Sequence, residues 1–307
     1  MDVTVAICTW NRAALLDKTL LRLRELAVPA GLRWELLVVD NNCTDDTQAV
    51  LAKHLQHLPL KPLTETKQGH SHARNRAVAE ARGKLLLWTD DDVLIAANWM
   101  TDIVAAAEVF PDAVFFGGPV RPWFERTPPT WLTQHLSRLS SVWALLDHGP
   151  EIRPLASTEY CFGANIAFRT DVLRRYPFDP DYGRVKARLT GGDETRVVDQ
   201  IRKEGGNGVW VGPAAVDHFL PADRMTPRYV FEFFRWASYQ GYAAFANDDS
   251  PRSFGAPRWM WKQYLSAGWK AKLRSGSKDA AWLDALLEAA KWRGLIDRFR
   301  AERKIQS

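Results

Sequence analysis

The most informative part of the chain is Lys84-Leu85-Leu86-Leu87-Trp88-Thr89-Asp90-Asp91-Asp92-Val93. Its apolar residues predict a short buried strand, and three consecutive aspartates follow at the carboxyl end of that strand. Because adjacent carboxylates repel one another, we expect a cation beside them. Mg²⁺ and Mn²⁺ bind carboxylate and phosphate oxygens, and open α/β sheets bind ligands at strand carboxyl ends. The stretch therefore indicates a metal and phosphate site; an acidic turn that caps the next helix is the alternative.

Strand and helix patterns alternate on both sides of this stretch. Alternation of this kind predicts an α/β fold with a mostly parallel, doubly wound sheet flanked by helices. The first half predicts strands over 3–8, 34–40, 60–64, 84–89 and 113–117, and helices over 13–26, 44–58, 72–82 and 99–110. The middle predicts helices over 131–146 and 194–203 and strands over 161–168, 209–211 and 215–218.

Helical patterns dominate the last part of the chain, over 227–247, 258–273 and 279–303. We therefore expect a domain over residues 1–225 and a helical C-terminal extension over 226–307. Residues 252–307 hold 13 Lys or Arg and 5 Asp or Glu, a balance of +8 within a chain of net charge +5. The extension also contains Trp259, Trp261, Trp269, Trp282 and Trp292.

Tryptophan together with lysine and arginine is favoured at membrane interfaces, so the extension could contact a membrane. The alternative is that its aromatic residues pack the helices onto the first domain or onto a second subunit. These residues are Phe231, Phe234, Trp236, Trp259, Trp261 and Trp269. No apolar run reaches the length of a spanning helix, and residues 1–8 have an acid where a signal peptide has basic residues. The three cysteines, an odd number without metal-type spacing, suit a cytoplasmic protein.

Polar residues also follow the first two predicted strands. The first strand ends in Thr9-Trp10-Asn11-Arg12 and the second in Asp40-Asn41-Asn42-Cys43-Thr44. Both groups belong to the sheet edge at which ligands bind. Asp40 suits either a contact with a nucleotide base or a local turn, whereas Asn42 and Thr44 are expected to cap the next helix.

Two further segments carry charged residues near predicted helix starts. Lys67-Gln68-Gly69-His70-Ser71-His72-Ala73-Arg74-Asn75 suits an anionic ligand, because free backbone N–H groups and the helix dipole favour negative charge. An ordinary solvated basic turn is the alternative. Gly191-Gly192-Asp193-Glu194 offers adjacent carboxylates, either as a general base or as favourable charge at a helix N-terminus.

Taken in order, these segments resemble the inverting glycosyltransferases of family 2, which have the GT-A fold, a Rossmann-like α/β architecture. Thr89-Asp90-Asp91-Asp92 resembles the family's Asp-x-Asp motif, and Val38-Val39-Asp40-Asn41-Asn42 its nucleotide-base segment. Phe162-Gly163-Ala164-Asn165 resembles its acceptor-side strand, and Gly191-Gly192-Asp193-Glu194 its acidic base motif. The ordered set is more specific than any single motif.

The resemblance implies a role for each candidate residue. Asp92 would bind Mg²⁺ or Mn²⁺, with His218 completing the metal site, and Asp90 would lie near the ribose or the metal. Asp91 would point away or toward the sugar. Asp193 or Glu194 would be the catalytic base, and the choice stays open because the family usually has Glu before Asp. Gly163 and Asn165 would lie on the sugar side. The nucleotide-binding set would be Thr9, Asn11, Arg12, Asp40, Lys67, Gly69, Arg74, Asp90 and Asp91.

The implied reaction transfers a sugar from a nucleoside diphosphate sugar, with UDP favoured through Asp40, to an acceptor hydroxyl in a single displacement. We expect a role in cell-envelope polysaccharide biosynthesis, in the cytoplasm or at the inner face of the membrane, without a nucleic-acid partner. The acceptor itself stays open among a polysaccharide, a lipid-linked glycan, a natural product and a protein. Two alternatives use the same kind of fold. One is a nucleotidyltransferase or a phosphohydrolase with an aspartate nucleophile, and the other is a non-catalytic, membrane-associated module.

Overall fold

A computed structural model describes residues 1–180, 192–240, 248 and 250–306. The predicted segments over 189–191 and 241–247 lie outside the described residues. The chain divides into two compact units. The first comprises Met1–Trp123 and the described parts of Trp143–Lys186 and Gly191–Phe219, and the second comprises Phe124–Val142 and the described part of Leu220–Ser307.

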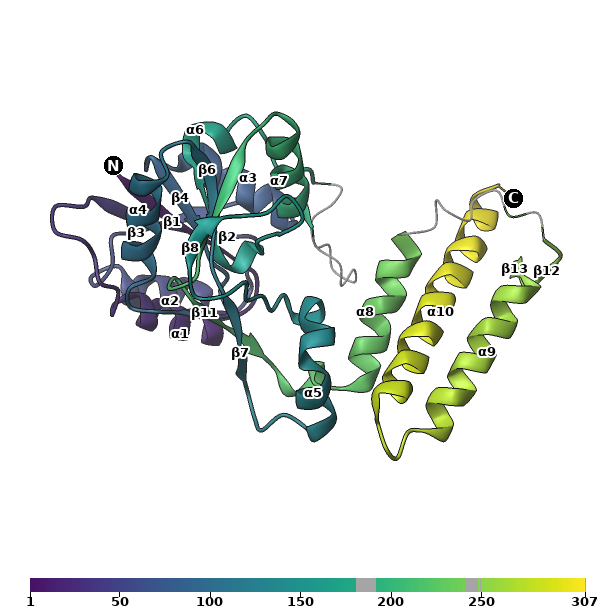
Figure 1. The fold of residues 1–307 in the computed structure, drawn as a ribbon. Helices are drawn as coiled ribbons and strands as arrows, with labels where there is room; N and C mark the ends of the chain where they lie inside the picture. Colours follow the sequence, from purple (N-terminus) through teal and green to yellow (C-terminus); the bar gives the residue numbers. More distant parts are fainter. Residues whose placement is uncertain (181–191, 241–247, 249, 307) are drawn as a thin grey trace. The chain divides into compact units, whose positions relative to one another are not determined.

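An eight-stranded sheet forms the centre of the first unit, in the order β3-β2-β1-β4-β9-β6-β10-β8 (Figure 1). Its strands are β1 (Val3–Thr9), β2 (Trp34–Asp40), β3 (Leu60–Thr64), β4 (Leu85–Trp88), β6 (Ala113–Gly117), β8 (Ile152–Pro154), β9 (Ile166–Arg169) and β10 (Asn207–Val211). Strands β1, β2, β3 and β4 pair in parallel, as do β6 and β10, whereas β9 and β8 run antiparallel to their neighbours. The mostly parallel sheet is therefore confirmed.

Two hydrophobic clusters cover the two faces of this sheet, because successive strand side chains point to opposite faces. Val5 and Ile7 of β1 belong to one cluster and Ala6 to the other. Helices α1 (Ala13–Leu23), α2 (Thr47–His54) and α4 (Trp99–Val109) contribute to the first cluster. Helices α3 (His70–Glu80), α6 (Thr170–Leu173) and α7 (Asp193–Lys203) contribute to the second. Helices on both faces make the sheet doubly wound, as predicted.

A second, three-stranded sheet has the order β5-β11-β7, formed by β5 (Val93–Ile95), β11 (Val216–Leu220) and β7 (Val120–Phe124). Strand β5 begins directly after the three aspartates. Its antiparallel register with β11 places His218 opposite Val93. This pairing brings a histidine from late in the chain to the aspartates that follow β4.

Three predicted elements differ from the structure. The predicted strand over 161–168 begins only at Ile166, because residues Gly163–Asn165 form a 3-10 helix, η2. The predicted helix over 131–146 is an α-helix only over α5 (Thr130–His135) and continues as a 3-10 helix, η1 (Leu136–Trp143). The next residue, Ala144, has a φ of 54°, which ends the helical path. The predicted helix over 44–58 is shortened to Thr47–His54.

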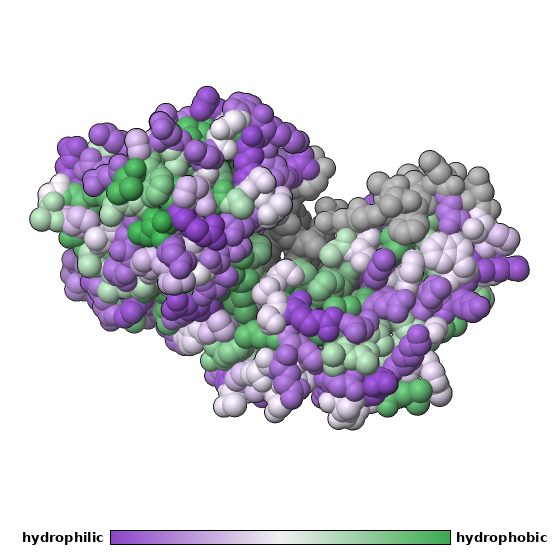
Figure 2. Space-filling model, in the orientation of Figure 1, coloured by the Kyte–Doolittle hydropathy of each residue, from purple (hydrophilic) through white to green (hydrophobic). Residues whose placement is uncertain are grey.

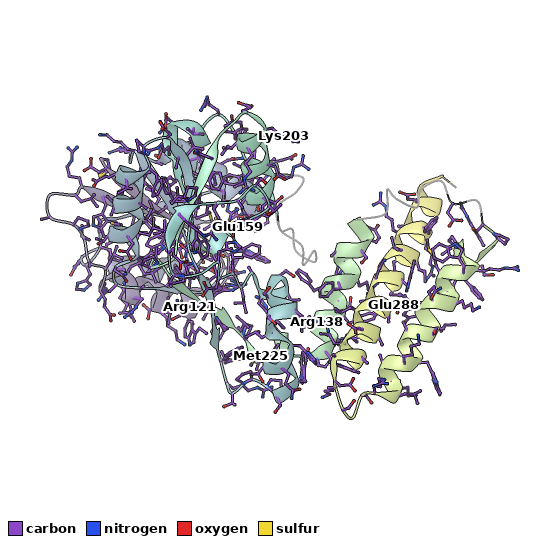
Figure 3. All side chains as sticks on the ribbon, viewed as in Figure 1. Arg121, Arg138, Glu159, Lys203, Met225 and Glu288 are labelled. Atoms are coloured by element: carbon purple, nitrogen blue, oxygen red, sulfur yellow. The ribbon has the colours of Figure 1, made fainter. Side chains whose placement is uncertain are left out.

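Three long helices dominate the second unit: α8 (Pro227–Gln240), α9 (Arg258–Leu273) and α10 (Ala280–Gln306). Helix α10 contacts both α8 and α9, and Figure 3 shows their side chains meeting along it, with Glu288 labelled on α10. Gly294 permits the close approach of α8, since a Cβ there would lie 2.1 Å from the carbonyl oxygen of Arg235. The short strands β12 (Arg252–Ser253) and β13 (Ala256–Pro257) precede α9. In the described part of the chain, no helix is both long and apolar enough to cross a membrane.

Candidate active site

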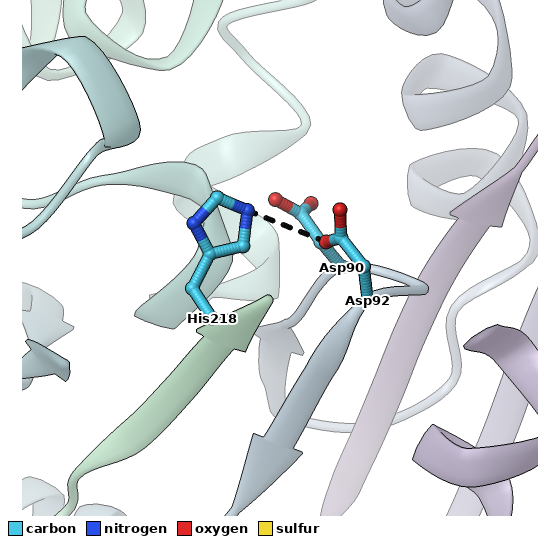
Figure 4. Close-up of side chains that lie close together, drawn as sticks. All are labelled: Asp90, Asp92 and His218. Atoms are coloured by element: carbon cyan, nitrogen blue, oxygen red, sulfur yellow. Dashed lines mark ion pairs between the residues drawn. The ribbon is translucent and has the colours of Figure 1, made fainter. Parts of the chain in front are cut away.

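Two carboxylates and an imidazole converge at the ends of β4 and β11. One ligand atom from each of Asp90, Asp92 and His218 lies within 4.8 Å of the others (Figure 4). His218 Nε2 lies 3.4 Å from Asp92 Oδ1, while His218 Nδ1 lies 2.9 Å from the carbonyl oxygen of Trp143. A carbonyl partner on Nδ1 fixes the ring so that Nε2 faces the carboxylates. Two carboxylates and one imidazole form a donor set that fits a divalent cation such as Mn²⁺.

Arg12 supplies a protein cation to the other side of the aspartate cluster. Its Nη1 donates to Asp91 Oδ1 at 3.0 Å and to Asp92 Oδ2 at 2.7 Å. Thr9 Oγ1 donates to Asp91 Oδ2 at 2.8 Å. Asp91 is buried, and residues at the end of β1 hold its carboxylate. Part of the repulsion evident in the sequence is relieved by Arg12.

Burial and the neighbouring charges shift the pKa values of Asp91 and His218. Burial raises the pKa of Asp91 to about 6, with Asp92 adding to the rise and Arg12 opposing it. Burial alone would lower the pKa of His218, but the negative charges of Asp92 and Asp90 outweigh that effect and raise it. A protonated His218 thus compensates the aspartates electrostatically, and a bound divalent cation would take over that role.

The loops after β1 and β2 are joined by side-chain hydrogen bonds. Asn11 Oδ1 accepts from the backbone N–H of Thr44 at 2.7 Å, and Asn42 Nδ2 donates to the carbonyl oxygen of Thr66 at 2.9 Å. The prediction that Asn42 and Thr44 cap the next helix is wrong, because α2 begins after Asp46 and both residues bind neighbouring loops. Asp40 is buried, and its Oδ1 accepts from the backbone N–H of Cys43 at 2.7 Å, which is the local turn foreseen for it.

Asn41 organises the basic loop that precedes α3, a role that was not predicted from the sequence. Its Nδ2 donates to the carbonyl oxygen of Lys67 at 2.8 Å, and its Oδ1 accepts from the N–H of Gly69 at 2.8 Å. Gly69 precedes α3 with a φ of 144°, a conformation that favours glycine. Lys67 and Gly69 therefore lie beside the ends of β1 and β2, where the predicted nucleotide-binding residues gather.

The carboxylates of Asp193 and Glu194, in the first turn of α7, meet a buried guanidinium. Arg74 Nη1 lies 3.2 Å from Asp193 Oδ1 and 3.1 Å from Glu194 Oε2. Asp193 also approaches Ser71 Oγ at 3.3 Å and His70 Nδ1 at 3.6 Å. Glu194 Oε1 accepts from the backbone N–H of Gly163 at 3.2 Å. The basic segment at the start of α3 is thus paired with the acidic motif.

Arg74 fits into a cradle that leaves no space for a larger neighbour. Its guanidinium carbon lies 5.6 Å from the ring centre of Trp88 and 5.1 Å from that of Phe178. A Cβ at Gly163 would lie 2.1 Å from Arg74 Nη2, so any larger residue there would displace the guanidinium. The rings and the glycine hold the cation in one place beneath the two acids. The sequence does not assign Trp88 or Phe178 to this site, because a buried aromatic residue, whether in strand β4 like Trp88 or outside the strands like Phe178, is typical of a core.

The two acids differ in exposure and in pKa direction. The side chain of Asp193 is 2% exposed and that of Glu194 is 14% exposed. Burial would raise the pKa of Asp193, but Arg74 and His70 hold it well below its ordinary value. Burial raises the pKa of Glu194, Asp193 raises it further, and Arg74 only partly opposes the rise. Asp193 is therefore a permanent anion, whereas Glu194 is the more basic carboxylate.

Asn165 lies in the protein interior, fully buried. Its Nδ2 donates to the carbonyl oxygens of Pro119 at 3.0 Å and Ala214 at 2.8 Å, and its Oδ1 accepts from Trp99 Nε1 at 2.8 Å. These bonds use the full capacity of the NH₂ group and tie η2 to α4 and to the loop before β11. Asn165 therefore supports the fold around the site, and its predicted place on the sugar side stays a prediction.

The two clusters influence one another electrostatically. Burial lowers the pKa of His218, Asp92 raises it, and Asp90 adds a smaller rise. Burial likewise opposes the raised pKa of Arg74, which Asp193 and Glu194 cause, with a smaller addition from Asp90. The Asp90 carboxylate therefore acts on both the candidate metal ligands and the cation beneath the acidic pair. The structure thus gathers acids from the ends of β4 and the start of α7 into one electrostatic region.

Comparison with known proteins places this arrangement in a family. The sequence profile of "Glycosyl transferase family 2" matches residues 4–176, more than half of the chain. The chain is 27% identical over 135 residues to "Succinoglycan biosynthesis protein ExoM" of Rhizobium meliloti (strain 1021), covering 43% of each protein. It is 26% identical over 263 residues to "Glucosyl-dolichyl phosphate glucuronosyltransferase" of Haloferax volcanii, covering 79% of this chain and 76% of the relative. The match thus spans less than half of the length of ExoM.

Solved structures share the fold. The mannosyltransferase PcManGT from Pyrobaculum calidifontis, solved with GDP-Man and Mn²⁺, superposes with a TM-score of 0.60 at 20% identity, covering 99% of this chain and 86% of that one. Residues 1–349 of S. aureus TarS, in complex with UDP, give a TM-score of 0.54 at 14% identity, covering 100% and 92%. These similarities confirm the predicted GT-A architecture, and the chain belongs to glycosyl transferase family 2.

Proposed function

We propose that this protein is a metal-dependent inverting glycosyltransferase that moves a sugar from a nucleoside diphosphate sugar to an acceptor hydroxyl. The convergence of Asp90, Asp92 and His218 from two separate strands carries the proposal. Family membership supports the reaction class over the nucleotidyltransferase, phosphohydrolase and non-catalytic alternatives. The Mn²⁺ in the PcManGT complex supports the metal.

Asp92 and His218 would hold the divalent cation, with Asp90 as a further ligand or a ribose contact. When bound, the cation supplies positive charge for the diphosphate leaving group. Arg12, Thr9 and Asp91 would orient Asp92, since Arg12 bridges both aspartates and Thr9 fixes Asp91. The described residues thus provide both the ligands and their support.

The nucleotide would bind along the ends of β1 and β2 and the loop before α3, where Asn11, Asp40, Lys67 and Gly69 lie. We favour UDP, from the resemblance at Asp40 and the UDP complex of the structurally similar TarS. Because PcManGT was solved with GDP-Man, GDP-sugars are the donors to test beside UDP-sugars. Arg74 is assigned away from the nucleotide, because its guanidinium is engaged by Asp193 and Glu194.

Glu194 would be the catalytic base. A base works best when its pKa approaches the operating pH, and the pKa of Glu194 is raised while that of Asp193 is lowered. Glu194 would accept the proton of the acceptor hydroxyl as that oxygen bonds to the anomeric carbon and the nucleoside diphosphate leaves. One displacement of this kind inverts the anomeric centre without a covalent intermediate.

For the acceptor, we propose a glycan of the cell envelope, met in the cytoplasm or at the inner face of the membrane. The names of two relatives support this class: one takes part in succinoglycan biosynthesis and the other acts on glucosyl-dolichyl phosphate. The basic, Trp-rich helices of the second unit suit a peripheral membrane contact or a contact with a second copy of the chain.

The test is a panel of UDP- and GDP-sugars added to the purified protein with Mn²⁺, with binding followed by calorimetry and hydrolysis by nucleotide release. We expect one donor to bind only in the presence of the cation, and the Asp92→Ala variant to lose that binding. NMR of the product from a simple acceptor should show an inverted anomeric configuration. Absence of binding to every donor, or retention of configuration, would contradict the proposal.

A further inference from the structure

Helix α9 presents exposed apolar residues on the side away from its packing partner. The packed side is formed by Met260, Ala267 and Ala271, which are buried. The other side carries Leu265, Trp269 and Leu273, which are 64%, 61% and 68% exposed. Trp269 therefore leaves most of its ring area uncovered by the other helices of the second unit. Single exposed apolar residues are common, but these three need an explanation because of their spacing.

The three residues are four positions apart, so they form a continuous strip on the helix surface. We call Leu265, Trp269 and Leu273 the α9 strip. It continues toward the N-terminus through Trp261, which is half-buried and whose ring lies 6.1 Å from that of Phe254. Phe254 is 84% exposed and has a φ of 51°, an unfavourable conformation for a residue with a side chain. The strained turn thus presents another aromatic ring at the end of the strip.

All charged residues of helix α9 are positively charged. Helix α9 contains no Asp or Glu, and its exposed residues include Arg258, Lys262, Lys270 and Lys272. No hydrogen bond or ion pair joins the ammonium groups of Lys262, Lys270 and Lys272 to any described residue. The acidic residues of the second unit are largely paired, as Asp297 is with Arg235 and Arg293. A partner for this face must therefore be apolar and anionic at once.

We propose that the exposed face of α9 binds the surface of an anionic lipid bilayer, with the α9 strip entering the headgroup region and the lysines facing lipid phosphates. A helix that lies in the interface needs an apolar side with tryptophan and a flanking set of lysines whose stems extend to the headgroups. Charge complementarity selects anionic lipid over a second copy of this chain, because two α9 faces would bring like charges together. The helix would lie on the membrane and not cross it.

The experiment measures flotation of the purified protein with vesicles of phosphatidylcholine, alone or mixed with phosphatidylglycerol. The wild type should bind the mixed vesicles, bind the neutral ones at least about tenfold less tightly, and release them as salt is raised. Two triple variants separate the contributions. Replacing Leu265, Trp269 and Leu273 by Ser should weaken binding to mixed vesicles at least about tenfold, and replacing Lys262, Lys270 and Lys272 by Gln should remove the preference for anionic lipid.

The matched control is Val109→Ser with Leu55→Ser, which removes two exposed apolar side chains from the first unit and should leave vesicle binding unchanged. The readout requires no sugar transfer, so its outcome is independent of the proposed reaction. Equal flotation of the wild type and the Ser triple variant would overturn the proposal, as would failure of the wild type to bind mixed vesicles. Light scattering that shows a dimer lost in the Ser variant, with vesicle binding retained, would instead assign the strip to a second copy and also overturn it.

Discussion

The guanidinium of Arg74 lies 3.2 Å from the carboxylate of Asp193, with both side chains almost fully buried. The contact joins the start of α3 to the start of α7. It gives the acidic motif a fixed cation and leaves the adjacent Glu194 as the carboxylate with the raised pKa. The opposite pKa shifts of Asp193 and Glu194 therefore depend on this ion pair.

Replacing Arg74 by Met should destabilise the protein by about 3–5 kcal/mol, because Asp193 would remain buried without its cation. Chemical denaturation measures this change in the free energy of unfolding. The matched control is Arg76→Met, since Arg76 pairs with Glu80 on the surface of the same helix and its loss should cost less than about 1 kcal/mol. If the two substitutions lower the free energy of unfolding equally, the buried pair stabilises the protein no more than the surface pair does.

Replacing Glu194 by Gln should lower kcat by about 100- to 10,000-fold while donor affinity stays near that of the wild type, because only proton transfer is lost. Steady-state kinetics and calorimetry measure the two quantities. Comparable transfer by the Gln variant would assign the base elsewhere.

The pH dependence of kcat should have an acid limb at higher pH than an ordinary glutamate gives. The active form is the unprotonated one, and burial raises the pKa of Glu194, so activity is lost as the pH falls through that raised value. Asp193→Asn should move the limb to lower pH, because the neighbouring anion that raises the pKa of Glu194 is gone. If the acid limb does not move in this variant, the pH dependence of kcat does not report the protonation of Glu194.

Replacing Gly163 by Ala should displace Arg74 and lower both kcat and stability, the latter by about 1–3 kcal/mol, because the added Cβ overlaps the guanidinium. The control is Gly268→Ala within α9, where a Cβ meets no atom within 4 Å and helix propensity predicts a gain of about 0.5–1 kcal/mol. Thermal and chemical unfolding of the two variants should therefore shift in opposite directions.

His218→Ala and Asp92→Asn should each weaken Mn²⁺-dependent nucleotide binding by about 10- to 100-fold, since the first removes a donor atom from the candidate cation site and the second removes a negative charge. Calorimetry with UDP, with and without Mn²⁺ and after treatment with a chelator, measures the effect. His148→Ala, which removes an imidazole from a different part of the first unit, should bind as the wild type does. Nucleotide affinity that is independent of the cation would contradict the metal role.

The sequence predicted the sheet well where the signal was local. The strands at 34–40, 60–64 and 113–117 begin and end as expected. For the first and third of these, an apolar run marks the strand directly. It failed at residues 161–165, where no strand forms. Gly163–Asn165 instead make a 3-10 helix, held by the interior hydrogen bonds of Asn165 and the close packing of Gly163. Non-local packing overrode local preference there.

The sequence by itself determined the alternating architecture, the acids at the end of β4 and the acidic pair at the start of α7, because periodicity and composition are properties of short segments. Only the tertiary structure decided how these groups are paired. Arg74 and Glu194 are 120 positions apart, Arg12 and Asp92 are 80 apart, and His218 reaches Asp92 through the register of β11 with β5. Such contacts depend on the order of strands in the sheets, which no short segment encodes, and they turned Arg74 from an expected nucleotide ligand into the cation of the acidic pair.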